Sequence, residues 1–188
     1  MRKLHIALIA TALVAASCGN SPKLTIPEDL FDSPLDSLEL RYSPSLERGA
    51  AAPDFAVPDT LGNELKLSYW RGKVVVLDFW ASWCGDCRRE FPAVKALYEQ
   101  YGQNTPSGFP VQFVSISFDH DADAWKSALR DQDFGWPQGS NLIRWKENPV
   151  SEAYGLHWIP TIYVIDPEGN VIAGCITAER VGQVLAKL

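Results

Sequence analysis

Short apolar runs and stretches of helical spacing alternate along this chain of 188 residues. Residues 74–79 are apolar and mostly β-branched except for Asp78, as expected of a strand buried on both faces. Residues 111–118 and 161–165 form two further apolar runs. Between and after these runs, apolar side chains recur every three or four residues, which predicts helices. The predicted helices cover residues 88–101, 122–130, 149–154 and 178–188.

Two pairs of short apolar segments flank turn-forming residues, a pattern typical of β-hairpins. The first pair is 55–57 with 65–67, and the second is 161–165 with 171–173. Strands that alternate with helices and end in a late hairpin indicate an α/β layered domain. We expect this domain to begin at about residue 49 and to continue to the end of the sequence.

The charge of the chain argues against nucleic-acid binding. Lys and Arg number 17 against 23 Asp and Glu, which gives a formal net charge of −6, and the basic residues form no dense cluster. Proteins that bind nucleic acid usually carry a basic patch or stripe, so we expect this chain to bind no nucleic acid.

The first 17 residues differ in kind from the rest. Arg2 and Lys3 precede a mostly apolar stretch that is too short to span a membrane, which predicts a secretory signal peptide over residues 1–17. Small residues lead directly into Cys18, an arrangement that resembles the lipobox of bacterial lipoproteins. The resemblance implies that Cys18 carries a diacylglycerol and anchors the mature chain to a membrane. A soluble secreted product is the alternative.

Residues 18–48 are predicted to form the lipid anchor and a tether. The segment holds four prolines and follows no helix or strand period, although several apolar residues make it less polar than a plain linker. Part of it therefore has the composition to dock on the domain or on a partner. Residues 131–148 are likewise expected to be irregular.

Two cysteines separated by two residues, Cys84 and Cys87, lie between the predicted strand 74–79 and the helix that follows it. Such a pair closes a small, reversible disulfide. A thiol at this position lies at the carboxyl edge of the sheet, where the helix amides stabilise its thiolate. A structural disulfide and half of a zinc site are the alternatives. Zinc normally requires a second Cys or His pair at a defined spacing, and Cys175, His120 and His157 form none, so we expect no metal.

The sequence VLDFWASWCGDC over residues 76–87 resembles the active-site region of the thioredoxin superfamily. The CRREFP sequence that begins at Cys87, the APDF sequence at 52–55 and the RGK sequence at 71–73 resemble its TlpA/ResA branch of envelope thiol–disulfide oxidoreductases. The resemblance covers about residues 49–188. It implies a thioredoxin fold, in which a central mixed β-sheet is flanked by helices and extended by an N-terminal β-hairpin.

The resemblance also implies roles for individual residues. Cys84 is the expected attacking thiolate and Cys87 the resolving thiol. Asp78 matches an aspartate that helps deprotonate the resolving cysteine, and Glu90 matches a glutamate with a similar role in the TlpA/ResA branch. Substrate is expected to contact Trp83 and the cis-proline loop of the family, which corresponds here to Ile159, Pro160 and Thr161.

One residue departs from the family pattern, which usually has proline before the second cysteine where this chain has Asp86. A carboxylate near Cys84 disfavours the thiolate and raises its pKa, although Arg88 and Arg89 offset this effect. A less stabilised thiolate makes the disulfide a weaker oxidant, so we expect the chain to donate electrons.

The sequence therefore predicts an exported, lipid-anchored enzyme of the bacterial cell envelope, on the periplasmic side, that reduces disulfides of exported proteins. It is expected to need no cofactor and to be recharged by an upstream thiol donor. A peroxiredoxin-like peroxidase is one alternative, although that family has a threonine where this chain has Ala81. A non-enzymatic binding module that uses the Pro160 groove is the other.

Overall fold

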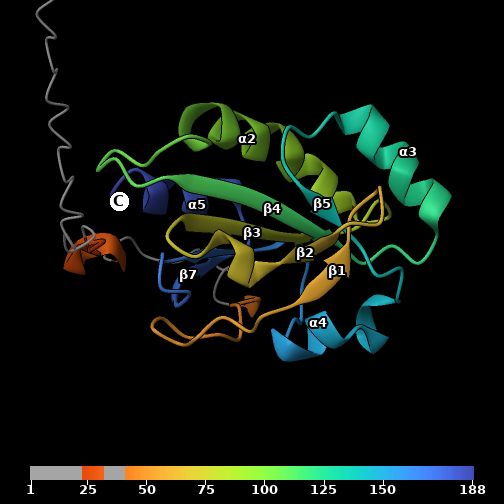
Figure 1. The fold of residues 1–188 in the computed structure, drawn as a ribbon, viewed down its shortest axis with the longest axis horizontal. Helices are drawn as coiled ribbons and strands as arrows, with labels where there is room; N and C mark the ends of the chain where they lie inside the picture. The colour runs from red at the N-terminus through yellow and green to blue at the C-terminus, as the bar shows by residue number, and fades with distance from the viewer. Residues whose placement is uncertain (1–22, 32–40) are drawn as a thin grey trace, which may run out of the picture.

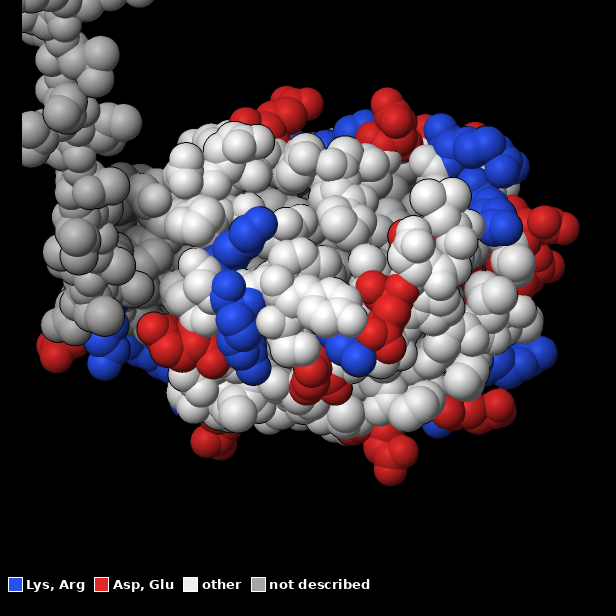
Figure 2. All heavy atoms as spheres, viewed as in Figure 1, with Lys and Arg blue, Asp and Glu red and all other residues white. Residues whose placement is uncertain are grey.

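The computed structural model describes residues 23–31 and 41–188. The predicted signal peptide, Cys18 and part of the predicted tether lie outside these residues. No helix formed by the described residues is both long and apolar enough to cross a membrane. On the face drawn in Figure 2, basic side chains are interspersed with acidic ones.

A mixed five-stranded sheet forms the centre of the domain (Figure 1). Its central strand β3 pairs in parallel with β4 and antiparallel with β6, which extends into the β6–β7 hairpin. The short strand β5 adds to the far side of β4. In spatial order the strands are β5 (Gln138–Gly139), β4 (Val111–Ser117), β3 (Val74–Trp80), β6 (Thr161–Ile165) and β7 (Val171–Cys175).

Helices cover both faces of this sheet, which explains why β3 is buried along its whole length. Alternate β3 residues point to opposite faces. One face packs against α2 (Gly85–Tyr101) and α5 (Ala178–Leu185), and the other packs against α4 (Pro149–Ala153) and the N-terminal hairpin. Figure 1 shows α2 and α5 on one side of the strands and α4 on the other. The remaining helix, α3 (Ala122–Gln132), follows β4.

The N-terminal hairpin consists of β1 (Ala56–Pro58) and β2 (Glu64–Lys66), followed by the 3-10 helix η2 (Leu67–Trp70). The mixed sheet, the flanking helices and this hairpin confirm the thioredoxin-like fold that the sequence predicts.

Part of the predicted tether docks on the domain. Leu24 and Leu30 are buried in the core beneath α5, and the 3-10 helix η1 (Glu28–Phe31) lies beside the C-terminus in Figure 1. The Lys187 ammonium bonds both the backbone carbonyl and the carboxylate of Asp29. The described residues 23–31 are therefore part of the folded unit.

Several helix boundaries differ from the sequence expectation by one to three residues, and α5, for example, ends at Leu185 and not at residue 188. Helix α2 begins at Gly85 and not at Arg88, because Cys84 is its N-cap residue. The segment 131–148, expected to be irregular, contains β5 and the 3-10 helix η3 (Trp145–Glu147). Both elements are only two or three residues long, which is too short for a period to be visible in the sequence.

Candidate active site

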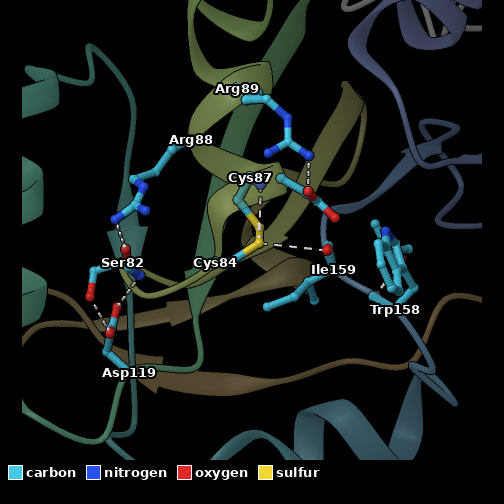
Figure 3. The surroundings of a disulfide bond; sticks show 10 residues. Ser82, Cys84, Cys87, Arg88, Arg89, Asp119, Trp158 and Ile159 are labelled. Carbon is cyan, nitrogen blue, oxygen red and sulfur yellow. Dashed lines mark hydrogen bonds and ion pairs between the residues drawn. A yellow bond between two sulfur atoms is a disulfide. The ribbon is translucent and has the colours of Figure 1, made fainter.

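A short turn carries the chain from the end of β3 into helix α2, and Cys84 stands at the junction. Cys84 and Cys87 are joined by a disulfide, with their Cα atoms 5.3 Å apart (Figure 3). The site is thus drawn in its oxidised form. Cys84 is 6% exposed and Cys87 only 1% exposed. Cys84 is therefore the more accessible of the two cysteines.

The start of helix α2 provides hydrogen-bond donors for the Cys84 sulfur. The backbone N–H of Cys87 donates to Sγ of Cys84 at 3.0 Å, so the sulfur takes the place of the usual N-cap oxygen. Helix α2 has 17 residues, and its N-terminus carries a partial positive charge. Both features favour a thiolate at Cys84 over one at Cys87.

A proline loop lies against the disulfide from the side of β6. The Ile159–Pro160 peptide bond is cis, and the Ile159 carbonyl oxygen lies 3.6 Å from Sγ of Cys84 (Figure 3). The Thr161 hydroxyl donates to the Trp158 carbonyl at 2.8 Å, which closes the loop. Ile159 and Thr161 are buried, so the side chains support the loop from beneath.

Asp78 lies within β3 and is buried. Burial raises its pKa to about 7, although a hydrogen bond from the Ser115 hydroxyl at 3.1 Å works in the opposite direction. The Trp136 indole donates to the same Ser115 hydroxyl at 2.8 Å. The negative charge of Glu90 raises the pKa of Asp78 further. A carboxyl group with this pKa can accept or release a proton near neutral pH.

Glu90, on helix α2, has a structural partner that the sequence does not reveal. Its carboxylate accepts a hydrogen bond of 2.7 Å from the backbone N–H of Ala178, the first residue of helix α5. A negative charge at a helix N-terminus is stabilising. Glu90 therefore ties α2 to α5 at the same time as it lies near enough to Asp78 to affect that residue's pKa.

Asp86 is paired. Arg89, one turn further along α2, forms an ion pair with its carboxylate (Figure 3). Arg88 turns the other way and donates to the Ser82 carbonyl at 3.1 Å. The negative charge next to the disulfide is therefore partly neutralised, which weakens the effect on Cys84 expected from the sequence. Both members of the ion pair are partly exposed, so solvent screens the pair as well.

Asp119 is a site residue that sequence reasoning missed. It follows the end of β4, is buried, and accepts hydrogen bonds from the Ser82 N–H at 2.9 Å and the Ser82 hydroxyl at 2.6 Å (Figure 3). The Ser117 hydroxyl donates to the same carboxylate at 2.7 Å. Ser82 is two residues before Cys84, so Asp119 positions the turn that presents the sulfur. The only signal in the sequence is an acidic residue after an apolar strand, on the same sheet edge as the cysteines.

Trp83 stands on the outer side of this turn. It is 49% exposed, and its ring centroid lies 6.3 Å from that of Trp145 in η3. Its neighbour Trp80 is instead completely buried at the end of β3, where its indole donates to Gln138 at 3.2 Å. Of Trp80 and Trp83, only Trp83 is available to a molecule that approaches the disulfide.

Three further candidates are Cys175, His120 and His157. Cys175 is buried at the end of β7, and His120 and His157 are exposed. Within residues 23–31 and 41–188, no three His, Cys, Asp or Glu side chains come together in a way that suits a metal ion.

Comparisons with known proteins find a matching family and named relatives. The sequence profile of the AhpC/TSA family matches residues 48–173. The thiol-disulfide oxidoreductase ResA of Bacillus thuringiensis subsp. konkukian is 30% identical over 146 residues, which cover 76% of this chain and 79% of the relative. The ResA protein of Geobacillus thermodenitrificans is 34% identical over 145 residues, which cover 74% and 77%.

A solved structure extends the similarity to three dimensions. A crystal structure of a protein named thiol:disulfide interchange protein DsbE from Chlorobium tepidum superimposes with a TM-score of 0.64 at 32% identity. The match covers 76% of this chain and 99% of that one. The relatives and the solved structure bear names of the same class of redox protein, and Cys84 and Cys87 supply the dithiol that this activity needs.

Proposed function

Because the chain belongs to the AhpC/TSA family of the thioredoxin superfamily and is a thiol–disulfide oxidoreductase, we propose that it reduces disulfides in exported proteins. Cys84 attacks and Cys87 resolves. The observation that carries this assignment is the hydrogen bond of 3.0 Å from the Cys87 N–H to Sγ of Cys84, the more exposed of the two cysteines.

The reaction proceeds by two exchanges. The Cys84 thiolate attacks one sulfur of the substrate disulfide, the substrate S–S bond breaks, and the other substrate sulfur leaves as a thiolate. Cys87 then loses its proton and attacks Sγ of Cys84, which releases the second substrate sulfur. The substrate gains two electrons and the chain ends with the disulfide seen in the structure. An upstream thiol donor returns the two electrons.

Asp78 is the proposed proton acceptor for Cys87. Its pKa of about 7 suits proton transfer at neutral pH, and Asp78 is buried in β3, the strand that leads into the turn of the two cysteines. Glu90 already accepts a hydrogen bond from Ala178, so its role in proton transfer is the weaker hypothesis.

The cis-proline loop is the proposed seat of the substrate backbone. An extended peptide that lies along Ile159, Pro160 and Thr161 brings its own sulfur to Cys84, because the Ile159 carbonyl lies 3.6 Å from that sulfur. Trp83 lies on the other side of the disulfide and contacts the flanking side chains of the peptide.

The site of action is the cell envelope. The sequence of residues 1–17 supports export, and Cys18 supports attachment to the membrane through a lipid. The lipid at Cys18 and the periplasmic location rest on the sequence alone, and palmitate labelling of wild-type chain and Cys18→Ser tests them. We expect the wild-type chain to be labelled and Cys18→Ser to remain unlabelled. If neither chain is labelled, the alternative of a soluble exported enzyme holds.

Peroxide reduction is the second candidate function, and the match to the AhpC/TSA family favours it. Against it, residue 81 is alanine where a peroxiredoxin has threonine, and the attacking sulfur is bonded to a cysteine one helical turn away. A peroxide-consumption assay with the reduced chain separates the two functions.

Trapping tests the proposal directly. In the native cells, Cys87→Ser is expected to accumulate mixed disulfides between Cys84 and substrate proteins, because the resolving thiol is lost. Cys84→Ser is expected to form none. Cys175→Ala is the matched control for a cysteine outside the site, and a chain with this change should behave as wild type. Mixed disulfides that form through Cys87 in the Cys84→Ser chain would reverse the assigned roles.

A further inference from the structure

An apolar groove leads away from the disulfide on the side opposite the cis-proline loop. It has a volume of about 470 Å³ and is lined by Trp83, Phe118, Trp145 and a rim of charged residues. Trp83 immediately precedes Cys84, so a polypeptide whose sulfur reaches Cys84 has its neighbouring residues over this groove. None of the roles assigned above uses the groove beyond Trp83.

The aromatic wall of the groove is rigid. The Trp145 ring stacks nearly parallel to Phe118, with ring centroids 6.5 Å apart and an angle of 14°. Below it, the buried Asn148 side chain donates to the Asn141 side chain at 2.7 Å and to the Ile143 carbonyl at 3.3 Å. The same side chain caps helix α4. The groove is thus formed before any peptide binds, which reduces the entropy cost of binding.

The rim of the groove is locally basic, in a chain whose net charge is −6. Arg144, Lys146 and His120 stand there against a single acid, Glu147. Within the described residues, neither Arg144 nor Lys146 forms an ion pair or a side-chain hydrogen bond. Unpaired cations beside an apolar surface attract a ligand that is both apolar and acidic.

From this geometry we propose that the groove binds the substrate polypeptide next to its disulfide cysteine and selects segments with an apolar or aromatic residue followed by an acidic one. The inference rests on the proposed function and adds a substrate class to it. An extended chain advances about 3.3 Å per residue. Trp83 and Trp145, 6.3 Å apart, therefore correspond to about two residues of a bound peptide, so the selected residues lie within about three of the cysteine.

The groove explains why η3 and Asn148 hold Trp145 so close to the active-site turn. The apolar contact supplies affinity. The cations make the groove prefer acidic segments over basic ones and speed the encounter with them. Because Arg144 and Lys146 are exposed, salt is expected to reduce the preference.

Model peptides test the proposal with the full chain in its reduced form. Two disulfide-bonded peptides share a Trp next to the cysteine and differ only in carrying two Glu or two Lys beyond it. Stopped-flow measurement of the rate constant for each gives a ratio internal to one protein, from which general losses of activity cancel. Wild type is expected to favour the acidic peptide about fivefold at low salt. The double change Arg144→Glu with Lys146→Glu is expected to invert this ratio.

Controls separate the failure of this inference from failure of the proposed function. Lys126→Glu changes an exposed lysine on α3 that does not line the groove, and should keep the wild-type ratio. A second pair of peptides carries Trp or Gly next to the cysteine. Trp145→Ala should reduce the ratio of the rate constant for the Trp peptide to that for the Gly peptide.

One outcome would overturn the inference about the groove, and another would overturn the proposed function. If wild type reduces hydroxyethyl disulfide but treats the acidic and basic peptides alike, the groove does not select substrates. If wild type fails to reduce hydroxyethyl disulfide, the dithiol chemistry itself is wrong.

Discussion

The Asp119 carboxylate accepts two hydrogen bonds from Ser82, one from the backbone N–H at 2.9 Å and one from the hydroxyl at 2.6 Å. These bonds join the end of β4 to the turn that leads from β3 to Cys84, across 37 positions of sequence. Asp119 does not touch the sulfurs in this arrangement. It positions the turn on which one of them stands.

Asp119→Asn is therefore expected to loosen the active-site turn. The new amide group opposes a donor from Ser82 or Ser117, and a buried donor without an acceptor costs about 1–3 kcal/mol. Denaturant unfolding should show a loss of that size, and the rate of attack on a peptide disulfide should fall. Asp131→Asn, on the exposed surface of α3, is the control. Equal stability and equal rates in both variants would show that Asp119 has no positioning role.

Asp78 makes the stability of the oxidised protein depend on pH. Its pKa of about 7 lies above the value of 3.8 for a free side chain, so the folded state keeps a proton that the unfolded state releases. The stability from this group is fully present below about pH 4 and is lost as pH rises through 7. With about 1.4 kcal/mol for each pKa unit, the loss is roughly 4 kcal/mol.

Asp78→Asn is expected to remove the fall in the free energy of unfolding that Asp78 causes as pH rises. Urea unfolding of the wild type and the variant between pH 4 and 8 measures the difference. The variant should gain stability relative to wild type as pH rises. A difference that stays constant over this range would mean that Asp78 does not titrate with a raised pKa.

Asp78 and Glu90 are expected to differ in the second exchange of the reaction. Release of a peptide from its mixed disulfide with Cys84 should accelerate in wild type as pH rises through about 7, because Asp78 must be ionised to accept a proton. Asp78→Asn should slow release by about 10²-fold or more and remove the pH dependence near 7. Glu90→Gln keeps an oxygen for the Ala178 amide and should release peptide almost normally. The reverse ranking would make Glu90 the proton acceptor.

The docked N-terminal segment should contribute to stability. Leu30 is 3% exposed and packs in the core beneath α5, so Leu30→Ala is expected to cost about 2 kcal/mol in the free energy of unfolding. Leu61→Ala is the matched control, because Leu61 is 84% exposed and its loss should change stability by no more than about 0.5 kcal/mol. Equal unfolding energies for the two variants would mean that residues 23–31 do not pack on the domain in solution.

The elements with a strong pattern were predictable from the sequence. The apolar run of β3, the late hairpin of β6 and β7, and the helical spacing of α3 all carry local signals, and the structure confirms them. The position of the two cysteines at a strand–helix junction followed from the same patterns.

The features that could not be predicted from the sequence depend on contacts between segments that are far apart along the chain. The bond between Asp119 and Ser82 exists because the two loops end on the same sheet edge, and the bond from Ala178 to Glu90 exists because α5 packs on α2. Neither has a local pattern. The burial of Leu24 and Leu30 likewise depends on residues far along the chain, among them those of α5 and β7. The apolar residues of the tether suggested docking, but the sequence did not show the surface on which they pack.

Alkylation of the reduced full chain tests the central claim most directly, which is that the fold makes the Cys84 sulfur the nucleophile. Iodoacetamide at limiting concentration, followed by mass spectrometry over a range of pH, gives the rate for each cysteine. Cys84 is expected to react first, with a thiolate pKa below about 8.5, the value for an unperturbed cysteine. Reaction of Cys84 no faster than a free thiol in solution, or slower than Cys87, would contradict the account.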